Sequence, residues 1–320
     1  MIIKHADDRN RDIDELNALL ALPYIDQSTK QEIQKEIKNI KSGIKGENDA
    51  AYIIDFHYGD HSKNWAVIHD LRVEYQGRVA QIDHMLINRL MEIYICESKN
   101  LNEGIAINEY GEFTAFYQGK PRGIESPVEQ NKRHRLLLEK MFNDGEIELP
   151  TRLGLKMKPR FRPLILMGKS ARITRPKNSK ADYLEQIIKA DQIRETIEND
   201  TKKIGLADGI GIVKIISTET LYDFAENIAA AHIPIKRDWK KRFGIIAPAP
   251  QAAAPKQAQA APQAAVQPAV SEAKPKPASK RPACADCGKT LTQKNIDFCQ
   301  NDKTRFQGRV YCFNCQKNHP

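Results

Sequence analysis

Residues 79–100, VAQIDHMLINRLMEIYICESKN, contain two runs in which apolar side chains alternate with other residues, joined by a short connection near Arg89. Alternation with period two predicts β-strands, and two successive strands with a short connection pair antiparallel. Glu97 and Lys99 then project from one face of the second strand, and Asp83 lies beside Glu97 on the first. The pattern therefore predicts a sheet that gathers two carboxylates and one amine.

Carboxylates on neighbouring strands form a hard oxygen site that suits Mg²⁺ or Mn²⁺, with water and phosphate oxygens as the remaining ligands. In such a site Lys99 would orient or deprotonate an attacking water. A lone Glu-x-Lys is also typical of a solvated strand face, so both interpretations are open at this point. The neighbourhood favours a site, because a helix bearing Gly46 and Glu47 precedes the strands and residues 126–131 open a helix after them.

Four sequence blocks carry a family resemblance. They are GEN at 46–48, AQIDH at 80–84, YICESKN at 94–100 and SPVEQN at 126–131. In this order they resemble the nuclease-related domain (NERD), over about residues 44–142. That family is similar to the PD-(D/E)xK nuclease superfamily, which includes restriction and repair endonucleases. Ile82 stands where the superfamily name has proline, a residue with no chemical part in the reaction.

The resemblance implies a role for each residue of the candidate active site. Asp83 and Glu97 would be metal ligands, and Glu47 would be the helix acid that adds a ligand, often through water. Lys99 would be the catalytic lysine and Gln130 the supporting polar residue of the following helix. The implied reaction is in-line attack of water on a phosphodiester, assisted by Mg²⁺ or Mn²⁺. Whether one or two ions bind is open.

The C-terminal part contains two Cys-x-x-Cys pairs separated by 24 residues. Such pairs are typical of a tetrahedral structural Zn²⁺ site. A disulfide scaffold or a redox motif is the alternative, but no secretory signal or thioredoxin-like βαβ pattern accompanies the pairs. Cys299, between them, could replace a ligand, but we expect it to be a packed or spare thiol, and Cys96 to be a buried core residue. The expected zinc ligands are Cys284, Cys287, Cys312 and Cys315.

This tail resembles the four-cysteine zinc module at the C-terminus of topoisomerase I, through CADCGKTL, FC and FQGRVYCFNCQ. The resemblance implies binding of single-stranded or distorted DNA, in which aromatic rings stack on bases and cations follow the backbone. Phe306 and Tyr311 are expected to fill the small core beside zinc instead. The residues expected to contact nucleic acid are Lys294, Lys303, Arg305, Arg309 and Phe313.

The charge balance favours an anionic partner. The chain has 50 Lys and Arg against 41 Asp and Glu, with a pI of about 9.1. From Lys274 onward, ten basic residues stand against three acidic ones. A second basic cluster, IKRDWKKR at 235–242, suits either contact with phosphates and a base through Trp239 or a solvated domain end. No apolar run approaches the ~18 residues of a membrane span, and the N-terminus lacks a secretory signal pattern, so a cytoplasmic location is expected.

The expected fold class is α/β, a restriction-endonuclease-like mixed sheet flanked by helices, with a small zinc ribbon on a flexible linker. We expect helices at 12–20, 28–41 (capped by Ser28), 128–142 and 218–231, a hairpin within 105–120, and strands at 163–167 and 210–216. The histidines are expected to be surface or packing residues. The expected segments are N-terminal helices (1–43), the nuclease-related domain (44–145), an α/β continuation (146–244), an Ala/Pro/Gln linker (245–280) and the zinc module (281–320).

Two functions are consistent with these patterns. The favoured one is a Mg²⁺-dependent DNA nuclease whose tethered zinc module binds nucleic acid. The alternative is a non-catalytic DNA-binding or scaffold protein that retains the nuclease fold. RNA as substrate, endonuclease or exonuclease action, and the oligomeric state are not distinguished by the sequence.

Overall fold

The protein is described by a computed structural model that covers residues 1–246, apart from 60–61, 153, 178–180 and 208–214. Within 283–318 it excludes 289–290, 292–295, 297, 301–302, 307–308 and 313–314. The chain forms two compact units, Met1–Gln251 and Ala252–Pro320. The expected strand at 210–216 and most of the expected linker lie outside the described residues.

Within the described residues, six strands form the main mixed sheet of the first unit, in the order β1-β2-β3-β4-β10-β12. The central strands β2, β3 and β4 are antiparallel neighbours, whereas β1 and β2, β4 and β10, and β10 and β12 are parallel pairs. The bounds are β1 (Ile2–Lys4), β2 (Trp65–Tyr75), β3 (Arg78–Asn88), β4 (Glu92–Lys99), β10 (Arg160–Met167) and β12 (Ile187–Lys189).

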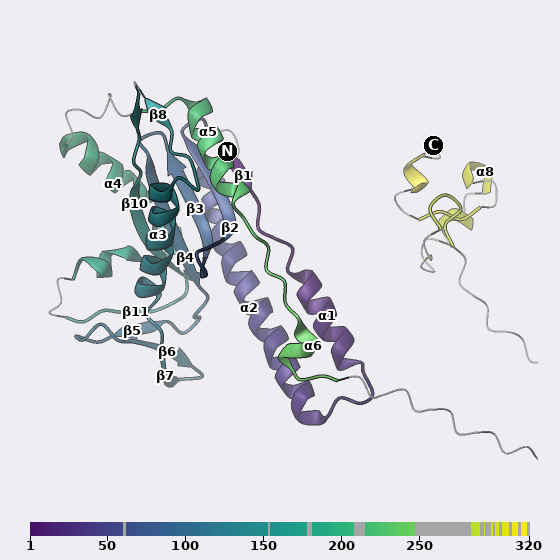
Figure 1. Cartoon of the computed structure of the whole chain (residues 1–320). Helices are drawn as coiled ribbons and strands as arrows, with labels where there is room; N and C mark the ends of the chain where they lie inside the picture. The colour runs from purple at the N-terminus through teal and green to yellow at the C-terminus, as the bar shows by residue number, and fades with distance from the viewer. Residues whose placement is uncertain are drawn as a thin grey trace, which may run out of the picture. The chain divides into compact units, whose positions relative to one another are not determined.

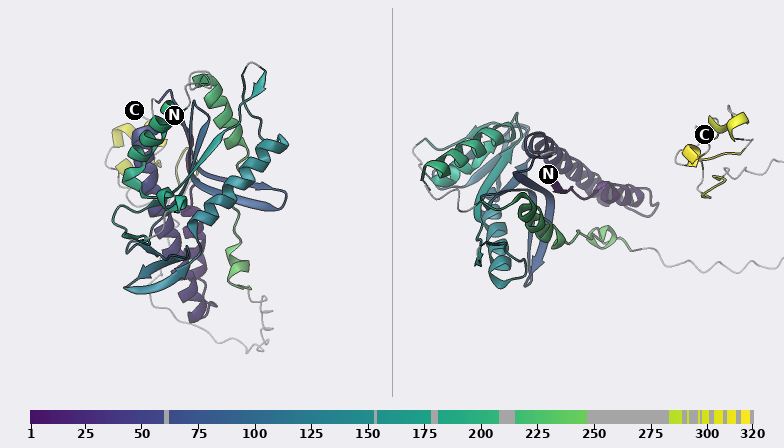
Figure 2. Two further views of the ribbon diagram at one scale, coloured as in Figure 1. Left: turned by 90° about the vertical axis from the view of Figure 1, so that its left-hand side faces the viewer. Right: turned by 90° about the horizontal axis from the view of Figure 1, so that it is seen from above.

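Helices cover both faces of this sheet. On one face, α2 (Gln27–Tyr58) and α4 (Ile193–Ala207) pack on a core that includes Tyr94 and Cys96 of β4. On the other, α3 (Pro127–Asp144) and α5 (Thr218–Ala230) pack on a core that includes Ile93 and Ile95. The view from above shows the sheet between these two pairs of helices (Figure 2). The alternation of β4 therefore separates two apolar cores, and Cys96 is buried in one of them, as expected.

The helix α2 extends well beyond the sheet, alongside α1 (Asn10–Leu20) and the short α6 (Trp239–Arg242) (Figure 1). It is a single helix of 32 residues, where the sequence indicated two. Its N-cap is Asp26, whose side chain accepts a hydrogen bond from the Thr29 N–H at 2.9 Å, so the expected cap at Ser28 is wrong by two residues. The helix continues through Gly43 and Gly46 because apolar residues pack on both sides of them.

The basic cluster at 235–242 is part of this helical layer. Trp239 is buried against α1 and α2, and its Nε1 donates to Asp12 Oδ1 at 2.9 Å. Arg237 pairs with the same carboxylate, and Arg237 and Arg242 both lie over the indole ring. Trp239 therefore anchors the end of the first unit, and its buried ring is not available to stack on a base.

A smaller sheet has the strand order β11-β5-β6-β7; β5, β6 and β7 lie between β4 and α3 in the chain, and β11 follows β10. Its strands are β5 (Ile105–Ile107), β6 (Phe113–Tyr117), β7 (Lys120–Ile124) and β11 (Ile173–Thr174). The hairpin of β5 and β6 confirms the expected turn near Gly111. The remaining elements are a two-stranded ribbon, β8 (Thr151–Arg152) with β9 (Leu155–Lys156), and the 3₁₀ segments Asp182–Gln186 and Ala190–Gln192.

The second unit contains α8 (Lys303–Phe306) and the 3₁₀ segment Cys315–Asn318. Its core is formed by Cys284, Leu291, Ile296, Cys299, Phe306 and Tyr311. The burial of Phe306 and Tyr311 agrees with their expected place in the core. The α/β fold class is confirmed, and no helix among the described residues is both long and apolar enough to cross a membrane.

Candidate active site and zinc site

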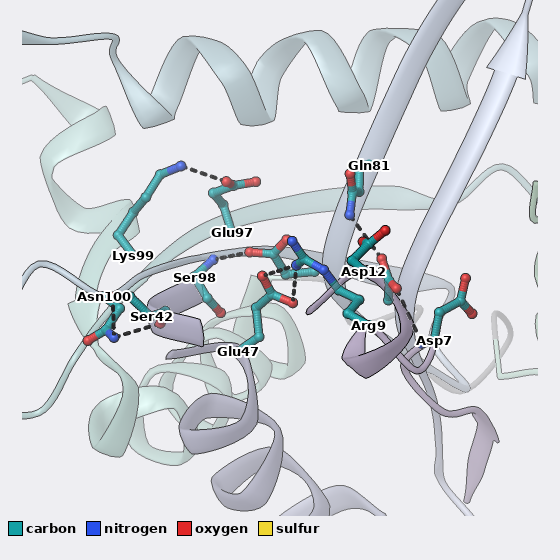
Figure 3. Close-up of polar contacts among 12 residues, drawn as sticks. Asp7, Arg9, Asp12, Ser42, Glu47, Gln81, Glu97, Ser98, Lys99 and Asn100 are labelled. Atoms are coloured by element: carbon teal, nitrogen blue, oxygen red, sulfur yellow. Dashed lines mark hydrogen bonds and ion pairs between the residues drawn. The ribbon is translucent and has the colours of Figure 1, made fainter. Parts of the chain in front are cut away.

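The last residues of β4 place Glu97 and Lys99 on one face of the sheet (Figure 3). Lys99 Nζ donates to Glu97 Oε1 at 2.7 Å and to Gln130 Oε1 at 3.1 Å. Gln130 Nε2 donates to the same Glu97 oxygen at 2.9 Å. Gln130 lies in the first turn of α3, which Ser126 caps through the Glu129 N–H. These three side chains therefore form a closed triangle of hydrogen bonds.

Asp83 lies on β3 at a place where the backbone ladders are interrupted. The register of β2 with β3 passes from His69↔His84 to Leu71↔Ile82 with no pair at Asp83. The paired residues of β3 with β4 likewise stop at His84. A hydrogen bond to a side chain replaces the backbone ladder here, because the Ser98 N–H donates to Asp83 Oδ2 at 2.7 Å. Asp83 is thus positioned by β4 itself.

Glu47 approaches from α2. Its carboxylate accepts hydrogen bonds from Arg9 Nη1 at 3.1 and 3.4 Å (Figure 3). The preceding Gly46 allows the close approach of α2 to β4, because a Cβ on this residue would lie 2.5 Å from the Cβ of Asn100. Asn100 Nδ2 also donates to the Ser42 carbonyl oxygen at 2.8 Å. Glycine at position 46 therefore brings the helix acid to the end of β4.

Electrostatics couple the three acids. Burial, together with the negative charges of Glu97 and Glu47, raises the pKa of Asp83 well above its ordinary value. Burial raises the pKa of Glu97, although Lys99 and Gln130 oppose the shift. Burial also raises the pKa of Glu47, against the opposing charge of Arg9. These carboxylates raise each other's pKa, and a bound cation would stabilise their ionised forms.

The donor set fits a hard divalent cation. Glu97 Oε2 is buried and has no hydrogen-bond partner, while Oε1 accepts both bonds from Lys99 and Gln130. Among the described residues, only the four cysteines bring three or more ligand atoms within 4.8 Å of one another. The oxygens of Glu47, Asp83 and Glu97 are therefore spaced more widely than a set that binds one ion directly. An ion held by fewer than three of these carboxylates, with water as its remaining ligands, is compatible with this spacing.

Two further buried residues of α3 lie against β4 near Glu97. Asn131 Nδ2 donates to the Ile95 and Leu164 carbonyl oxygens at 2.9 and 3.1 Å, and so joins β4 to β10. His134 Nδ1 lies 3.9 Å from Glu97 Oε2. Burial, with the nearby charges of Arg133 and Lys99, lowers the pKa of His134 to about 4, so its ring is neutral near pH 7.

The second unit brings its two Cys-x-x-Cys pairs together. The four Sγ atoms of Cys284, Cys287, Cys312 and Cys315 all lie within 4.8 Å of one another, so these residues could hold a zinc ion. Burial opposes ionisation of Cys284, but backbone N–H groups that include that of Cys312 lower the pKa of its thiol to about 6. A thiolate stabilised by backbone N–H groups is the form that binds Zn²⁺. Cys299 is outside this set.

Cys299 is a packed thiol. It is fully buried, and its Sγ accepts hydrogen bonds from the Tyr311 N–H at 3.3 Å and from Gln316 Nε2 at 3.4 Å. Of the expected nucleic-acid contacts, Arg309 is exposed. Arg305 is also exposed, but it donates to the Gln316 carbonyl oxygen and lies over the Phe306 ring. Lys294, Phe313 and the side chain of Lys303 lie outside the described residues.

Comparison with known families agrees with this geometry. Residues 42–166 match the family model of the nuclease-related domain. The chain therefore contains a nuclease-related domain, and the matched range runs from the middle of α2 to β10. It includes Glu47, Asp83, Glu97, Lys99 and Gln130. Comparisons with curated proteins and with solved structures gave no significant match.

Sequence reasoning missed several residues around the site. Arg9 is 38 residues from Glu47, and no local pattern signals their pairing. Asp70 is nearly buried on β2 with a left-handed φ of 51°, and its carboxylate accepts hydrogen bonds from Gln81 and from the Asp7 N–H. The negative charge of Asp70 also raises the pKa of Glu47. The His69-Asp70 dipeptide, which follows the apolar start of β2, was the one available signal.

Proposed function

We propose that this protein is a nuclease that uses Mg²⁺ or Mn²⁺ to hydrolyse phosphodiester bonds in DNA. The proposal depends on one observation, the contact of Lys99 with Glu97 beside Asp83. Burial and the charges of the neighbouring acids raise the pKa of Asp83. Together with the nuclease-related domain at 42–166, this contact supports a phosphodiester-cleaving site rather than a solvated strand face.

The residues divide the chemistry among them. Asp83 and Glu97 would hold the cation, and Glu47 would complete its shell through water. A divalent ion bound there supplies Lewis acidity toward a phosphoryl oxygen and lowers the pKa of water. Lys99 donates hydrogen bonds toward the attacking water and the developing charge on the phosphate, while Gln130 keeps the lysine in place. The triangle of bonds fixes these groups before substrate arrives, which reduces reorganisation during the reaction.

The four-cysteine module would bind zinc and hold nucleic acid near the candidate active site. The basic excess from Lys274 onward supports contact with a phosphate backbone. A tether between two modules raises the local concentration of substrate without a new contact. We propose that this module binds single-stranded or distorted DNA.

One observation favours the alternative, a non-catalytic DNA-binding protein with the nuclease fold. Glu47 is paired with Arg9, and the oxygens of Glu47, Asp83 and Glu97 do not all lie within 4.8 Å of one another. A carboxylate neutralised by arginine is a weaker cation ligand. In that case the nuclease-related domain would serve as a binding surface only.

Digestion of a substrate panel tests the proposal. The full chain is incubated with single-stranded, duplex, nicked and branched DNA and with RNA, in the presence of Mg²⁺, Mn²⁺ or a chelator. We expect metal-dependent cutting of at least one DNA substrate and none with the chelator. DNA binding without cutting of any substrate would support the alternative, and cutting of RNA alone would contradict DNA as the substrate.

A further inference from the structure

A line of hydrogen bonds, buried at its centre and partly buried at both ends, crosses the sheet beside the candidate active site. Asp55 Oδ1 of α2 lies 2.9 Å from His69 Nε2, and His69 Nδ1 lies 2.8 Å from His84 Nδ1. His84 Nε2 in turn lies 3.0 Å from Ser98 Oγ. We call these four residues the histidine relay. It joins α2, β2, β3 and β4, and the two imidazole rings are each 2% exposed.

The relay lies at the interruption of the backbone ladders around Asp83. His69↔His84 is the last pair of β2 with β3 before the interruption, and His84↔Cys96 is the last pair of β3 with β4. Beyond these pairs no backbone ladder holds β4 to β3, and Ser98 takes over through two bonds. Its Oγ bonds to His84, and its N–H bonds to Asp83.

The chemistry of the groups gives the relay one direction. An ionised carboxylate only accepts, so His69 must carry its proton on Nε2. The contact between the two Nδ1 atoms needs one donor and one acceptor, and each neutral ring has one N–H and one bare nitrogen. His69 Nδ1 therefore accepts from the His84 Nδ1–H, and His84 Nε2 accepts from the Ser98 hydroxyl. The Ser98 hydroxyl thus donates its proton to His84.

Burying two imidazoles in contact costs desolvation, and apolar residues would pack a sheet at lower cost. A fully satisfied polar chain does, however, fix one geometry, and outer residues of this kind orient the ligands of metal sites. Asp83 has no ladder partner and depends on Ser98 for its position. The backbone ladder of β4 with β10 holds Ser98 on one side, and the relay holds it on the β3 side.

We propose that Asp55, His69 and His84 are positioning residues that hold Ser98 in one orientation. The Ser98 N–H then keeps the Asp83 carboxylate in place for a divalent cation, and the Ser98 hydroxyl oxygen presents only lone pairs on the α2 side. This inference rests on the proposed function, since it concerns the same cation site. It adds a role for four residues outside the acid and lysine set.

The first test is spectroscopic. In the full chain labelled with ¹⁵N-histidine, two-bond ¹⁵N–¹H correlations report which nitrogen of each ring is protonated. We expect Nε2–H for His69 and Nδ1–H for His84, assigned with His69→Gln and His84→Gln. Asp55→Ala should mix the tautomers of both rings, whereas Asp55→Asn, whose amide oxygen still accepts, should keep them. The opposite tautomers in the wild type would overturn the relay.

The second test is calorimetric titration with Mn²⁺ alone. Asp55→Ala and Ser98→Ala should each weaken Mn²⁺ binding by about tenfold, the usual effect of losing an outer-shell partner. The double variant should be no weaker than the worse single variant, because both changes break one chain. Asp55→Asn and Ser98→Thr should stay within about threefold of the wild type. Asp49→Ala, an exposed acid of the same helix, is the matched control.

The outcomes separate this inference from the proposed function. If the wild type cuts DNA and folded Asp55→Ala and Ser98→Ala bind Mn²⁺ with unchanged affinity, the positioning role is overturned and the nuclease stands. If Mn²⁺ affinity and tautomers behave as expected but no nucleic acid is cut, the relay stands and the nuclease proposal fails. A wild type that binds no Mn²⁺ overturns both.

Discussion

At the scale of single residues, Asp83 combines a poor environment for an anion with a fixed geometry. Its carboxylate accepts the Ser98 N–H at 2.7 Å and experiences the charges of Glu97 and Glu47. A group whose pKa is raised on folding favours the folded state while it is protonated, and this contribution is lost as the pH rises through the raised pKa. The cost of keeping Asp83 ionised is therefore present near neutral pH, and a bound cation would offset it.

The first prediction follows from this cost. Asp83→Asn should raise the melting temperature of the metal-free protein by about 2–4 °C at about pH 8, because the amide keeps the acceptor for Ser98 and removes the charge. The gain should shrink toward about pH 5, where more of the wild-type carboxyl is protonated. Thermal unfolding with a chelator measures both values, with Asp49→Asn as the exposed control. A lower melting temperature for Asp83→Asn at the higher pH would contradict the electrostatic account.

At the scale of elements, α2 determines whether an acid from outside the sheet can reach β4. The contact of Gly46 with Asn100 leaves no room for a side chain, and Glu47 follows immediately. The neighbouring Gly43 lies on the same helix, but a Cβ there would meet its nearest atom, Glu47 Oε1, at an ordinary 3.6 Å. Two glycines three residues apart thus have different roles.

This difference gives a matched pair of substitutions. Gly46→Ala should destabilise the protein by about 1–3 kcal/mol, since α2 must move away from β4, and should reduce cleavage with it. Gly43→Ala should leave stability unchanged or raise it by about 0.5–1 kcal/mol, because alanine favours the helix. Urea denaturation of both variants measures the effect. Equal stability of the two variants would contradict the close approach of α2.

The strand pair and the acid and lysine set were predictable because period-two alternation fixes which face each side chain takes. Alternation places Asp83, Glu97 and Lys99 together, whereas their expected roles and that of Gln130 came from the resemblance to the nuclease-related domain. The continuous α2 was not predictable, since two glycines usually weaken a helix and only the contact with Asn100 explains the second. The histidine relay was not predictable either, because its members lie on four elements and meet only through tertiary packing.

At the scale of the whole molecule, the two compact units separate the chemistry. Met1–Gln251 contains the nuclease-related domain, and Ala252–Pro320 contains the four clustered cysteines. Each unit has its own apolar core. Truncation should therefore separate the proposed cleavage activity from the proposed DNA binding by the C-terminal unit.

A truncated protein of residues 1–246 should fold and retain metal-dependent cleavage, with weaker binding to single-stranded DNA. Removal of the basic tail should also reduce the slope of log affinity against log salt, because fewer counterions are released. Fluorescence anisotropy at several salt concentrations compares the truncated and full chains. Cys312→Ser in the full chain, measured for bound zinc, controls for the fold of the module. An unchanged affinity and slope after truncation would show that the tail does not bind DNA.

The central claim is that Asp83, Glu97 and Lys99 form one metal-dependent phosphodiester-cleaving site. Single-turnover cleavage of end-labelled DNA by the wild type, Asp83→Ala and Lys99→Ala, with DNA affinity measured in parallel, tests it most directly. The account predicts that each variant cuts at least about 100-fold more slowly while its DNA affinity stays within about threefold. Equal cleavage rates for the three folded proteins would contradict it.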